Sequence, residues 1–174
     1  MKIQRIHQIG ERAIRAKSKV VAHPASEQNQ KLVQDLVRVM CKEGLVGIAA
    51  PQIGINKRLF ITQPRSTKFR SRKTKAQILV YFNPSIIKRS AATETAYEGC
   101  GSVAHAGIFG KVGRSVSVTV KAQDRRGDWF TLKATGLLAR IIQHEYDHLE
   151  GVVFLDRVKD TRSLISREAY INKI

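Results

Sequence analysis

Apolar side chains recur every three to four positions over residues 26–43, which is the spacing of an amphipathic helix. The residues that form this apolar face are Leu32, Val33, Leu36, Val37, Val39 and Met40. Ser26 stands where a helix N-cap is expected, since its hydroxyl can accept a hydrogen bond from the first backbone N–H groups. The pattern therefore predicts a helix over residues 26–43 that packs one face against a core.

Two short apolar runs predict strands in the next part of the chain. Residues 59–61 and residues 78–82 consist of aliphatic and aromatic side chains, a composition typical of buried strands. The second run stops at Asn83-Pro84, a pair that often forms a turn, and residues 85–88 predict a further short strand. Between the two runs, residues 64–75 carry six basic side chains and no acidic one, which predicts a solvated loop.

Alternation of apolar and polar positions is clearest in residues 116–133. Val116, Val118 and Val120 alternate with polar residues, which predicts a strand with one buried face. The polar, glycine-containing segment 124–128 separates this strand from a second one over residues 129–133. Two strands joined by such a short polar segment predict a β-hairpin.

The last third of the chain returns to helical spacing. Residues 136–151 carry apolar side chains on more than one side of the predicted helix, so this helix is expected to run through the core. A shorter basic helix is predicted over residues 161–171. We therefore expect one α+β domain over residues 1–174, with short, mostly antiparallel strands around a central helix.

The composition is that of a globular protein with an unusual charge. Of the 174 residues, 43% are hydrophobic, which argues against disorder, and no apolar run is long enough to predict a membrane span. Lysine and arginine outnumber the acids by 31 to 14, giving a net charge of +17. This charge favours polyanionic partners such as RNA. Two cysteines are too few for a disulfide framework, so a cytoplasmic location is expected.

The central helix carries the sequence His144-Glu-Tyr-Asp-His148. Positions i and i+4 lie one turn apart on the same helix face, so both imidazoles can bind one metal ion. Glu145 lies between them and can reach a water on that ion. An apolar helix is a costly place for these groups unless they are paired or bound to metal. Two hydrogen-bonded core histidines beside a salt-bridged glutamate would, however, give the same sequence.

A catalytic site of this kind needs a third protein ligand and one open position. The acids downstream of the motif are Glu150, Asp156, Asp160 and Glu168. The sharper candidate lies upstream, in the sequence Glu98-Gly-Cys-Gly-Ser102, where the thiol of Cys100 stands between two glycines. Cys41 has no such neighbours and is predicted to be a small buried apolar residue.

Three motifs together resemble the peptide deformylase family. They are Gly47-Ile-Ala-Ala-Pro-Gln52, Glu98-Gly-Cys-Gly-Ser102 and Gln143-His-Glu-Tyr-Asp-His-Leu149, in that order. Residues 9–15 also look like the family's opening segment, which makes the N-terminus part of the fold rather than a transit peptide. The resemblance implies a metallohydrolase that removes the formyl group from the N-terminal formyl-methionine of new polypeptides and releases formate.

The resemblance also implies the roles of the central residues. One divalent metal ion would be held by Cys100, His144 and His148. The family favours Fe(II), and zinc, nickel or cobalt suit the same ligands. Glu145 would act as general base and then as general acid. The side-chain amide of Gln52 and the backbone N–H of Gly101 would stabilise the oxyanion.

Further residues would bind the substrate. The backbone near Val46, Gly47 and Gly99 would, by resemblance, pair with the extended peptide like an added strand. Such main-chain pairing does not depend on the identity of most side chains, which suits an enzyme that acts on many nascent chains. Leu137 and Ile141 lie one turn apart on the central helix and would line the methionine pocket, although ordinary core packing explains them equally well.

Two further acids would support the site. Glu98 and Arg114 match a pair that the family uses as an ion pair to brace the cysteine loop. Asp147 lies inside the HExxH motif, and we interpret it as a structural acid rather than a metal ligand.

The sequence departs from the family pattern at three places. One is the stretch 102–114, which is slightly longer than usual and ends in Val-Gly-Arg where the family often has Val-Pro-Arg. The glycine that usually opens the first motif is Leu45 here, and the leucine that commonly follows the cysteine is Gly101. The backbone N–H of residue 101 remains, but glycine removes an apolar wall and loosens the loop. We therefore expect an active enzyme with a slower rate or a shifted substrate preference.

Three other functions remain open at the level of sequence. A different HExxH peptidase or amidase predicts a third ligand downstream of the motif and no role for Cys100. A cysteine hydrolase would use Cys100 as the nucleophile, but would leave the HExxH motif without a role. A basic ribosome- or RNA-binding relative with weakened activity fits the charge, although none of the ligands is missing.

For a deformylase, the positive charge indicates a location more than an activity. The substrate emerges from the ribosome beside RNA, so a basic surface raises the encounter rate without reading any nucleic-acid sequence. We expect transient ribosome contact through residues 65–75 and through Arg157, Lys159, Arg162, Arg167 and Lys173. A surface that is basic throughout explains the charge equally well, and no membrane partner is expected.

Overall fold

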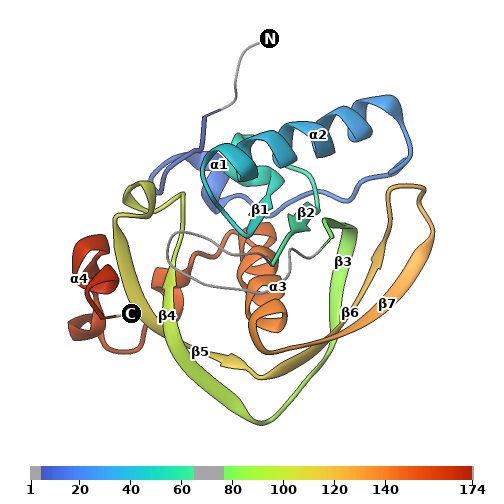
Figure 1. Cartoon of the computed structure of the whole chain (residues 1–174). Helices are drawn as coiled ribbons and strands as arrows, with labels where there is room; N and C mark the ends of the chain where they lie inside the picture. Colours follow the sequence, from blue (N-terminus) through green and yellow to red (C-terminus); the bar gives the residue numbers. More distant parts are fainter. Residues whose placement is uncertain (1–4, 65–76, 174) are drawn as a thin grey trace.

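The chain folds as two antiparallel sheets around a central helix (Figure 1). The computed structural model describes residues 5–64 and 77–173, and within these residues every strand pairing is antiparallel. The larger sheet has the order β1 (Gly47–Ala49), β2 (Leu59–Thr62), β3 (Leu79–Arg89), β6 (Ser117–Gln123) and β7 (Trp129–Thr135). The smaller sheet has the order β4 (Thr93–Gly99), β5 (Ile108–Ser115) and β8 (Ile165–Ser166).

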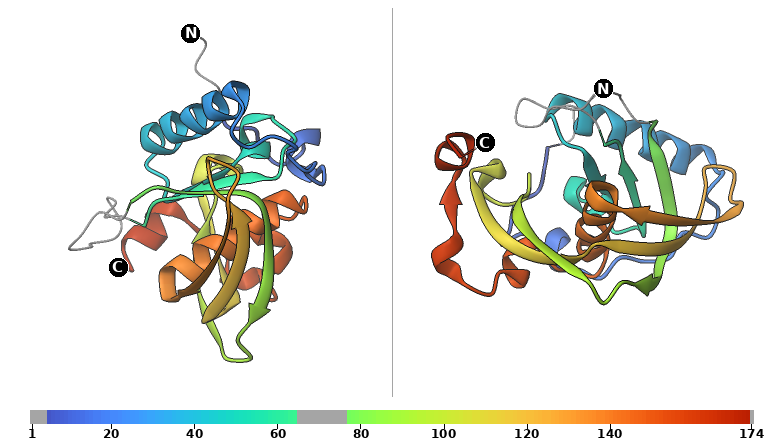
Figure 2. Two further views of the ribbon diagram at one scale, coloured as in Figure 1. Left: turned by 90° about the vertical axis from the view of Figure 1, so that its right-hand side faces the viewer. Right: turned by 60° about the horizontal axis from the view of Figure 1, so that its bottom comes forward.

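Four α-helices complete the described part of the chain. They are α1 (Arg12–Arg15), α2 (Glu27–Lys42), α3 (Gly136–Leu149) and α4 (Arg167–Ile171). Helix α3 contacts β1, β2 and β7 of the larger sheet and β5 of the smaller one, so it lies where the two sheets meet (Figure 2). None of the helices in the described residues is both long and apolar enough to cross a membrane.

Strand β2 is buried on both faces, and this divides the core. Leu59 and Ile61 pack into a cluster with the apolar face of α2, whereas Phe60 packs into a second cluster with α3. Successive side chains of a strand point to opposite faces, which explains why neighbours enter different clusters. Truncating a fully buried residue such as Leu36 to alanine typically costs about 2–5 kcal/mol.

Most of the predicted elements are confirmed. The helix expected over residues 26–43 is α2, and Ser26 occupies its N-cap position, although its side chain makes no capping hydrogen bond. The helix that carries the HExxH sequence is α3, and the predicted hairpin is β6 with β7. The fold class, α+β with antiparallel strands, is also confirmed. The basic residues 65–75 lie outside the described residues.

Two predicted boundaries were wrong. Asn83-Pro84 does not end a strand, because β3 continues through it to Arg89 with an irregular register between Phe82 and Ser85. Asn83 takes a positive φ of 50° there, and its side chain bonds both backbone groups of Val21. The predicted C-terminal helix over residues 161–171 is instead a 3₁₀ turn, the short strand β8 and the single helical turn α4.

Strands β4 and β5 were not predicted. The first three residues of β4 are exposed, and Glu98 is its only buried residue, so β4 has no alternating apolar pattern. It is held by seven residue pairs with β5. This hairpin matters for function because it ends at Cys100 and carries that residue against α3.

Candidate metal centre and active site

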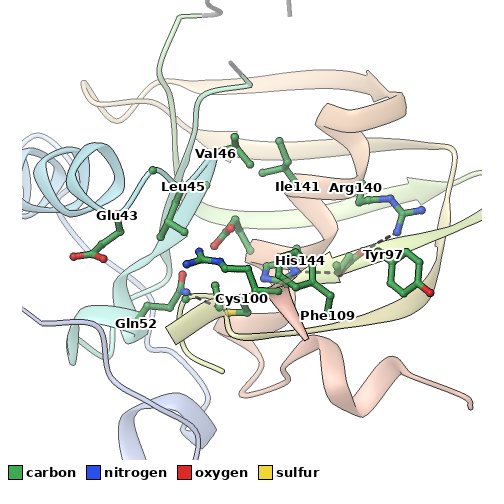
Figure 3. A pocket seen from close by; sticks show the side chains of 18 of the residues that line it. Glu43, Leu45, Val46, Gln52, Tyr97, Cys100, Phe109, Arg140, Ile141 and His144 are labelled. Atoms are coloured by element: carbon green, nitrogen blue, oxygen red, sulfur yellow. Dashed lines mark hydrogen bonds and ion pairs between the residues drawn. The ribbon is translucent and has the colours of Figure 1, made fainter. Parts of the chain in front are cut away.

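The site begins where β4 ends against α3. Cys100 follows the last residue of β4, and His144 and His148 lie one turn apart on α3. The three potential ligand atoms of these residues all lie within 4.8 Å of one another. Segments that are far apart in the sequence are thus brought together by the pairing of β4 with β5 and by the packing of β5 on α3 (Figure 3).

The two histidines are oriented by their neighbours. Nδ1 of His144 lies 3.0 Å from Oε2 of Glu98, so His144 can donate there and keep Nε2 for a metal ion. Nε2 of His148 lies 3.2 Å from Sγ of Cys100. Nδ1 of His148 is buried and has no hydrogen-bond partner among the described residues. Both Nε2 atoms are therefore available beside the sulfur.

The ionisation of Cys100 favours metal binding, because the thiolate and not the thiol is the metal ligand. Burial alone would raise the pKa of the Cys100 thiol, but the charge of His148 and the bonds to both histidines hold that pKa well below its usual range. The pKa of His144 is raised, because the bonds to Cys100 and Glu98 outweigh the effect of its burial, so a metal ion has to displace a proton from this ring. One thiolate and two imidazoles form a donor set that fits a tetrahedral divalent ion with one open position. The residues present thus fit a metal site.

Glu145 lies beside the ligands in a buried position. Its exposed fraction is 4%, and its Oε2 atom has no hydrogen-bond partner within the described part of the chain. Burial raises the pKa of Glu145 to about 7, against the opposing charges of His144 and His148. A carboxyl group with a pKa near neutrality can both take up and return a proton.

Only glycine fits at position 47, because the side chain of Glu145 lies directly against the backbone there. A Cβ atom built on Gly47 would lie 2.6 Å from Oε1 of Glu145 and 2.8 Å from Cγ2 of Ile141. Any other residue would displace the carboxylate. The backbone of β1 therefore lies directly against the general-base candidate.

The predicted oxyanion residues lie at the same place. Gln52 is buried, and its Nε2 atom lies 3.6 Å from Sγ of Cys100 and 3.3 Å from Oγ of Ser102. Its Oε1 atom accepts a 2.8 Å hydrogen bond from the backbone N–H of Ala49, which fixes the amide with its NH₂ group toward the sulfur. The carbonyl of Gly101 accepts a 2.9 Å bond from Gln8, so the N-terminal segment holds this peptide in place.

Glu98 is the centre of a buried ion-pair network. Its carboxylate accepts hydrogen bonds from Nε and Nη2 of Arg114 at 3.0 and 2.9 Å and from Nη1 of Arg140 at 2.8 Å. Asp147 binds Arg114 and Arg157 and lies outside the ligand cluster. The expected ion pair between Glu98 and Arg114 is present, and Asp147 is not one of the three clustered ligand residues.

A pocket of about 530 Å³ opens over this site, within the usual size of ligand pockets. The predicted substrate residues that line it are Val46, Gly47, Gly99, Leu137 and Ile141. Figure 3 shows Leu45 and Val46 on one side of the pocket, with Tyr97 and Phe109 on the other. The prediction for Cys41 was wrong: it is exposed and lies at the end of α2, where it lines the pocket.

Some residues of the site were not predicted from the sequence. Arg140 lies four residues before His144, on the same face of α3, and this spacing was a signal that could have indicated it. Ser102 lies within the cysteine motif and bonds Gln52. Arg167 and Tyr170 of α4 also line the pocket, and no local pattern connects them with it.

Comparison with protein families gives a single assignment. Residues 3–163 match the model of the polypeptide deformylase family. A peptide deformylase of Pelotomaculum thermopropionicum is 37% identical over 97% of this chain and 99% of its own length. Peptide deformylase 2 of a Nostoc species is 36% identical over 95% of this chain and 91% of its own length.

Solved structures give the same assignment. A class I type b peptide deformylase of Acinetobacter baumannii, bound to Met-Ala-Ser, has a TM-score of 0.83 with 29% identity over 90% of this chain and 99% of its own. A peptide deformylase of Synechococcus elongatus, in complex with actinonin, has a TM-score of 0.78 with 33% identity over 97% of this chain and 81% of its own. The fold, the metal-ligand cluster and these similarities agree, and the chain belongs to the peptide deformylase family of metal-dependent enzymes, which remove the formyl group from nascent polypeptides.

Proposed function

We propose that Cys100, His144 and His148 hold the catalytic metal ion of this deformylase and that Glu145 transfers the protons of the reaction. The observation that carries the proposal is the cluster of three ligand atoms within 4.8 Å beside a buried carboxyl group with a pKa of about 7. A divalent ion at such a site supplies Lewis acidity and lowers the pKa of water toward neutrality.

The residues around the metal site would transfer the protons and stabilise the negative charge of the reaction. Glu145 takes a proton from the attacking water and gives it to the amine that leaves when the formyl C–N bond breaks. The Nε2 group of Gln52 and the backbone N–H of Gly101 donate to the oxygen on which negative charge develops. Removing one such donor typically lowers kcat about 100-fold. Formate and a free methionine N-terminus are the products.

The substrate lies along the backbone of two strands. We assign the edges of β1 at Gly47 and of β4 at Gly99 to main-chain pairing with the extended nascent chain. Leu137 and Ile141 form the apolar wall for the methionine side chain, since both line the pocket on the face of α3 that leads to His144. The Acinetobacter baumannii relative was solved with Met-Ala-Ser, a peptide of the kind that deformylation leaves.

Fe(II) is the metal that we assign to the site. The cluster of one thiolate and two imidazoles accepts several divalent ions, so the assignment requires measurement. We expect the anaerobically purified protein to contain iron, to lose activity in air, and to regain it with nickel or cobalt. Full activity of the protein loaded with zinc alone would contradict this assignment.

A formate-release assay tests the proposed roles. The substrate is a formyl-methionyl tripeptide, and the wild-type protein is compared with Glu145→Ala under anaerobic conditions. Loss of the general base should lower kcat by about 10²- to 10⁴-fold while the metal content stays unchanged. Glu27→Ala, a change in an exposed residue at the start of α2, serves as the matched control. Formate release that survives Glu145→Ala would contradict the mechanism.

We also propose a cytoplasmic enzyme that contacts the ribosome transiently through its basic surface. Part of the C-terminal charge is neutralised within the protein, because Arg157 is paired with Asp147 and Arg162 with Asp160. Contact should therefore be weak and sensitive to salt. Co-sedimentation with ribosomes at low and high ionic strength measures it, and binding that is absent at low ionic strength would contradict it.

A further inference from the structure

Residues 104–106 form a left-handed turn shortly after the cysteine motif. The φ angles of Ala104, His105 and Ala106 are 46°, 51° and 58°, a region that alanine in particular rarely adopts. Backbone of this kind persists only where its surroundings hold it, and it is common at active sites. The turn lies in the stretch 102–114, which departs from the family pattern, so the family pattern does not account for it.

The turn fixes the peptide group between Cys100 and Gly101. The carbonyl of Cys100 accepts hydrogen bonds from the backbone N–H groups of Val103 at 3.0 Å and Ala106 at 3.1 Å. In a planar trans peptide, the C=O and the N–H point in opposite directions. Holding the Cys100 carbonyl toward the turn therefore directs the N–H of Gly101 away from the turn. This N–H is the donor that we assign to the oxyanion.

The side-chain amide of Gln8 spans the loop that contains this turn. Its Oε1 atom accepts a 3.1 Å hydrogen bond from the backbone N–H of His105, and its Nε2 atom donates a 2.9 Å bond to the carbonyl of Gly101. A single amide group thus bonds both the beginning of the loop and the middle of the left-handed turn. The two bonds together keep the turn at a fixed place relative to Gly101.

The backbone of residues 7–9 binds the segments that carry both proposed oxyanion donors. The N–H of His7 donates a 2.8 Å bond to the carbonyl of Gln52, which is the first donor. The N–H of Ile9 donates a 2.8 Å bond to the carbonyl of Ser102, the residue after the second donor. The two donors come from distant parts of the sequence, and this short segment connects them.

We propose that Gln8 is a positioning residue for the deformylase reaction: its amide holds the left-handed turn, and the turn aims the N–H of Gly101 at the oxyanion. Gln8 is not among the residues that line the pocket, so its effect on the reaction passes through the backbone of the loop. The proposal rests on the deformylase function given above and deepens it, by adding a residue outside the three motifs that controls how well the transition state is stabilised.

Gln8→Ala tests the proposal, because it removes both bonds to the loop. In formate release from a formyl-methionyl tripeptide by the metal-loaded protein, kcat should fall about tenfold, a part of the roughly 100-fold loss that removal of one oxyanion donor causes. KM should change less than about twofold, because the oxyanion forms only in the transition state. Binding of the product peptide Met-Ala-Ser, measured by calorimetry, should be unchanged.

Gln30→Ala is the matched control. Gln30 is half-buried like Gln8, and its Nε2 atom donates to the carbonyls of Pro24 and Arg125, each at 2.9 Å. Its Oε1 atom accepts a 2.9 Å bond from Nε of Arg125, so this amide also connects distant segments, but it does not line the pocket. The control variant loses a comparable set of hydrogen bonds and should keep the wild-type kcat.

A glycine in the turn should compensate for the loss of the amide. Glycine adopts a positive φ without steric strain, so His105→Gly should let the turn keep its conformation without Gln8. The side chain of His105 is exposed and has no part in the proposed mechanism. We expect His105→Gly alone to keep the wild-type kcat, and the double variant to recover most of the activity that Gln8→Ala loses.

Hydrogen–deuterium exchange of residues 100–107 measures the same effect without turnover. Exchange in this segment should be faster in Gln8→Ala than in the wild type, because the N–H groups of the turn lose their fixed geometry. Gln30→Ala should exchange there like the wild type, and the double variant with His105→Gly should exchange more slowly than Gln8→Ala.

The outcomes of these measurements are distinct. Wild-type kcat in Gln8→Ala would overturn the positioning role and leave the deformylase function intact. A loss of bound metal in proportion to the loss of kcat would also overturn it, because the residue would then act on the metal ligand. Equal activity of Gln8→Ala and the double variant would exclude the turn as the route. Failure of the wild-type enzyme to release formate would instead contradict the deformylase function itself.

Discussion

Leu45 occupies the space beside Gly101. A Cβ atom built on Gly101 would lie 3.5 Å from Cδ1 of Leu45 and 3.0 Å from Cδ1 of Ile6. These are two of the places at which the sequence departs from the family pattern, with leucine where glycine is usual and glycine where leucine is common. The two departures are therefore reciprocal: the apolar wall that Gly101 lacks is supplied from the loop before β1.

The contact between positions 45 and 101 predicts how substitutions of these two residues change the activity. Gly101→Leu alone should lower kcat/KM, because the new side chain meets Leu45 and Ile6 in a buried loop whose N–H is assigned to the oxyanion. Leu45→Gly alone should lower it as well, because the wall is lost. The double variant should recover most of the loss, with a coupling of about 1 kcal/mol or more, which corresponds to about fivefold in kcat/KM.

Formate release and thermal unfolding of the four proteins measure this coupling. The backbone of Gly101 does not require glycine, since no positive φ is found there, so the substitution tests packing rather than backbone strain. Losses that simply add in the double variant would contradict the reciprocal exchange.

Elements with strong hydrophobic periodicity could be predicted from the sequence, whereas elements that depend on strand pairing could not. Helices α2 and α3 follow from spacing alone. Strand β4 does not, because its only buried side chain is the charged Glu98 and its position is set by the pairing with β5. The break expected at Asn83 was wrong because a local rule for turns is overridden by hydrogen bonds to Val21 and Gln123.

Only the part of the candidate site that lies in short sequence motifs could be predicted from the sequence. His144, His148 and Glu145 stand in a motif whose helical spacing has a physical reason, and Cys100 joined them through the resemblance to the family, so all four could be named without the fold. Arg167 and Tyr170 reach the pocket only because β8 pairs with β5, and such long-range contacts leave no local pattern. Cys41 was placed wrongly because it points away from the apolar face of α2: Met40 beside it is fully buried, whereas Cys41 is exposed.

Replacing Glu98 by glutamine should weaken metal binding and stability together. Glu98 binds His144 and two buried or partly buried arginines, so Glu98→Gln leaves charge without its partner, at a cost of about 3 kcal/mol. Loss of the carboxylate behind a ligating histidine typically lowers metal affinity about 10- to 100-fold. Metal titration and urea unfolding measure the two effects.

Asp147→Asn is the matched control for Glu98. Asp147 also binds Arg114, and it binds Arg157, but it is placed away from the ligand atoms. This variant should lose stability and keep its metal affinity. Equal metal affinity of Glu98→Gln and the wild type would show that Glu98 only braces the loop.

Asp156 should contribute stability that is lost in acid. Burial acts to raise its pKa, but bonds from Arg15 and from the backbone N–H of Val153 outweigh burial and lower it. A group with a lowered folded-state pKa stabilises the protein above its unfolded pKa of about 4, and the contribution disappears as pH falls through the folded value. Asp156→Asn should therefore destabilise the protein at neutral pH and have little effect in strong acid.

The expected size of the Asp156 effect is about 1 kcal/mol at neutral pH, because the side chain is 37% exposed and solvent screens the ion pair. Urea unfolding of both proteins across the acid range measures it. Asp128→Asn, at a side chain that is 71% exposed, is the control. A stability difference between wild type and Asp156→Asn that is independent of pH would contradict the assignment to this carboxylate.

Removal of the metal ion should destabilise the fold through Cys100. A ligand that binds only the folded state adds about 2.7 kcal/mol at a free concentration of 100 times its Kd. For a chain of this length, that corresponds to a shift in Tm of about 5–10 °C. We expect a chelator to lower Tm by this amount and added Ni(II) to restore it.

In Cys100→Ser, neither treatment should move Tm by more than a small part of that shift, because a serine hydroxyl replaces the thiolate ligand. Cys41→Ser changes the exposed cysteine at the end of α2 and should respond to metal as the wild type does. A full metal-dependent shift in Cys100→Ser would mean that the third ligand lies elsewhere, as a metallopeptidase with a ligand downstream of His148 requires.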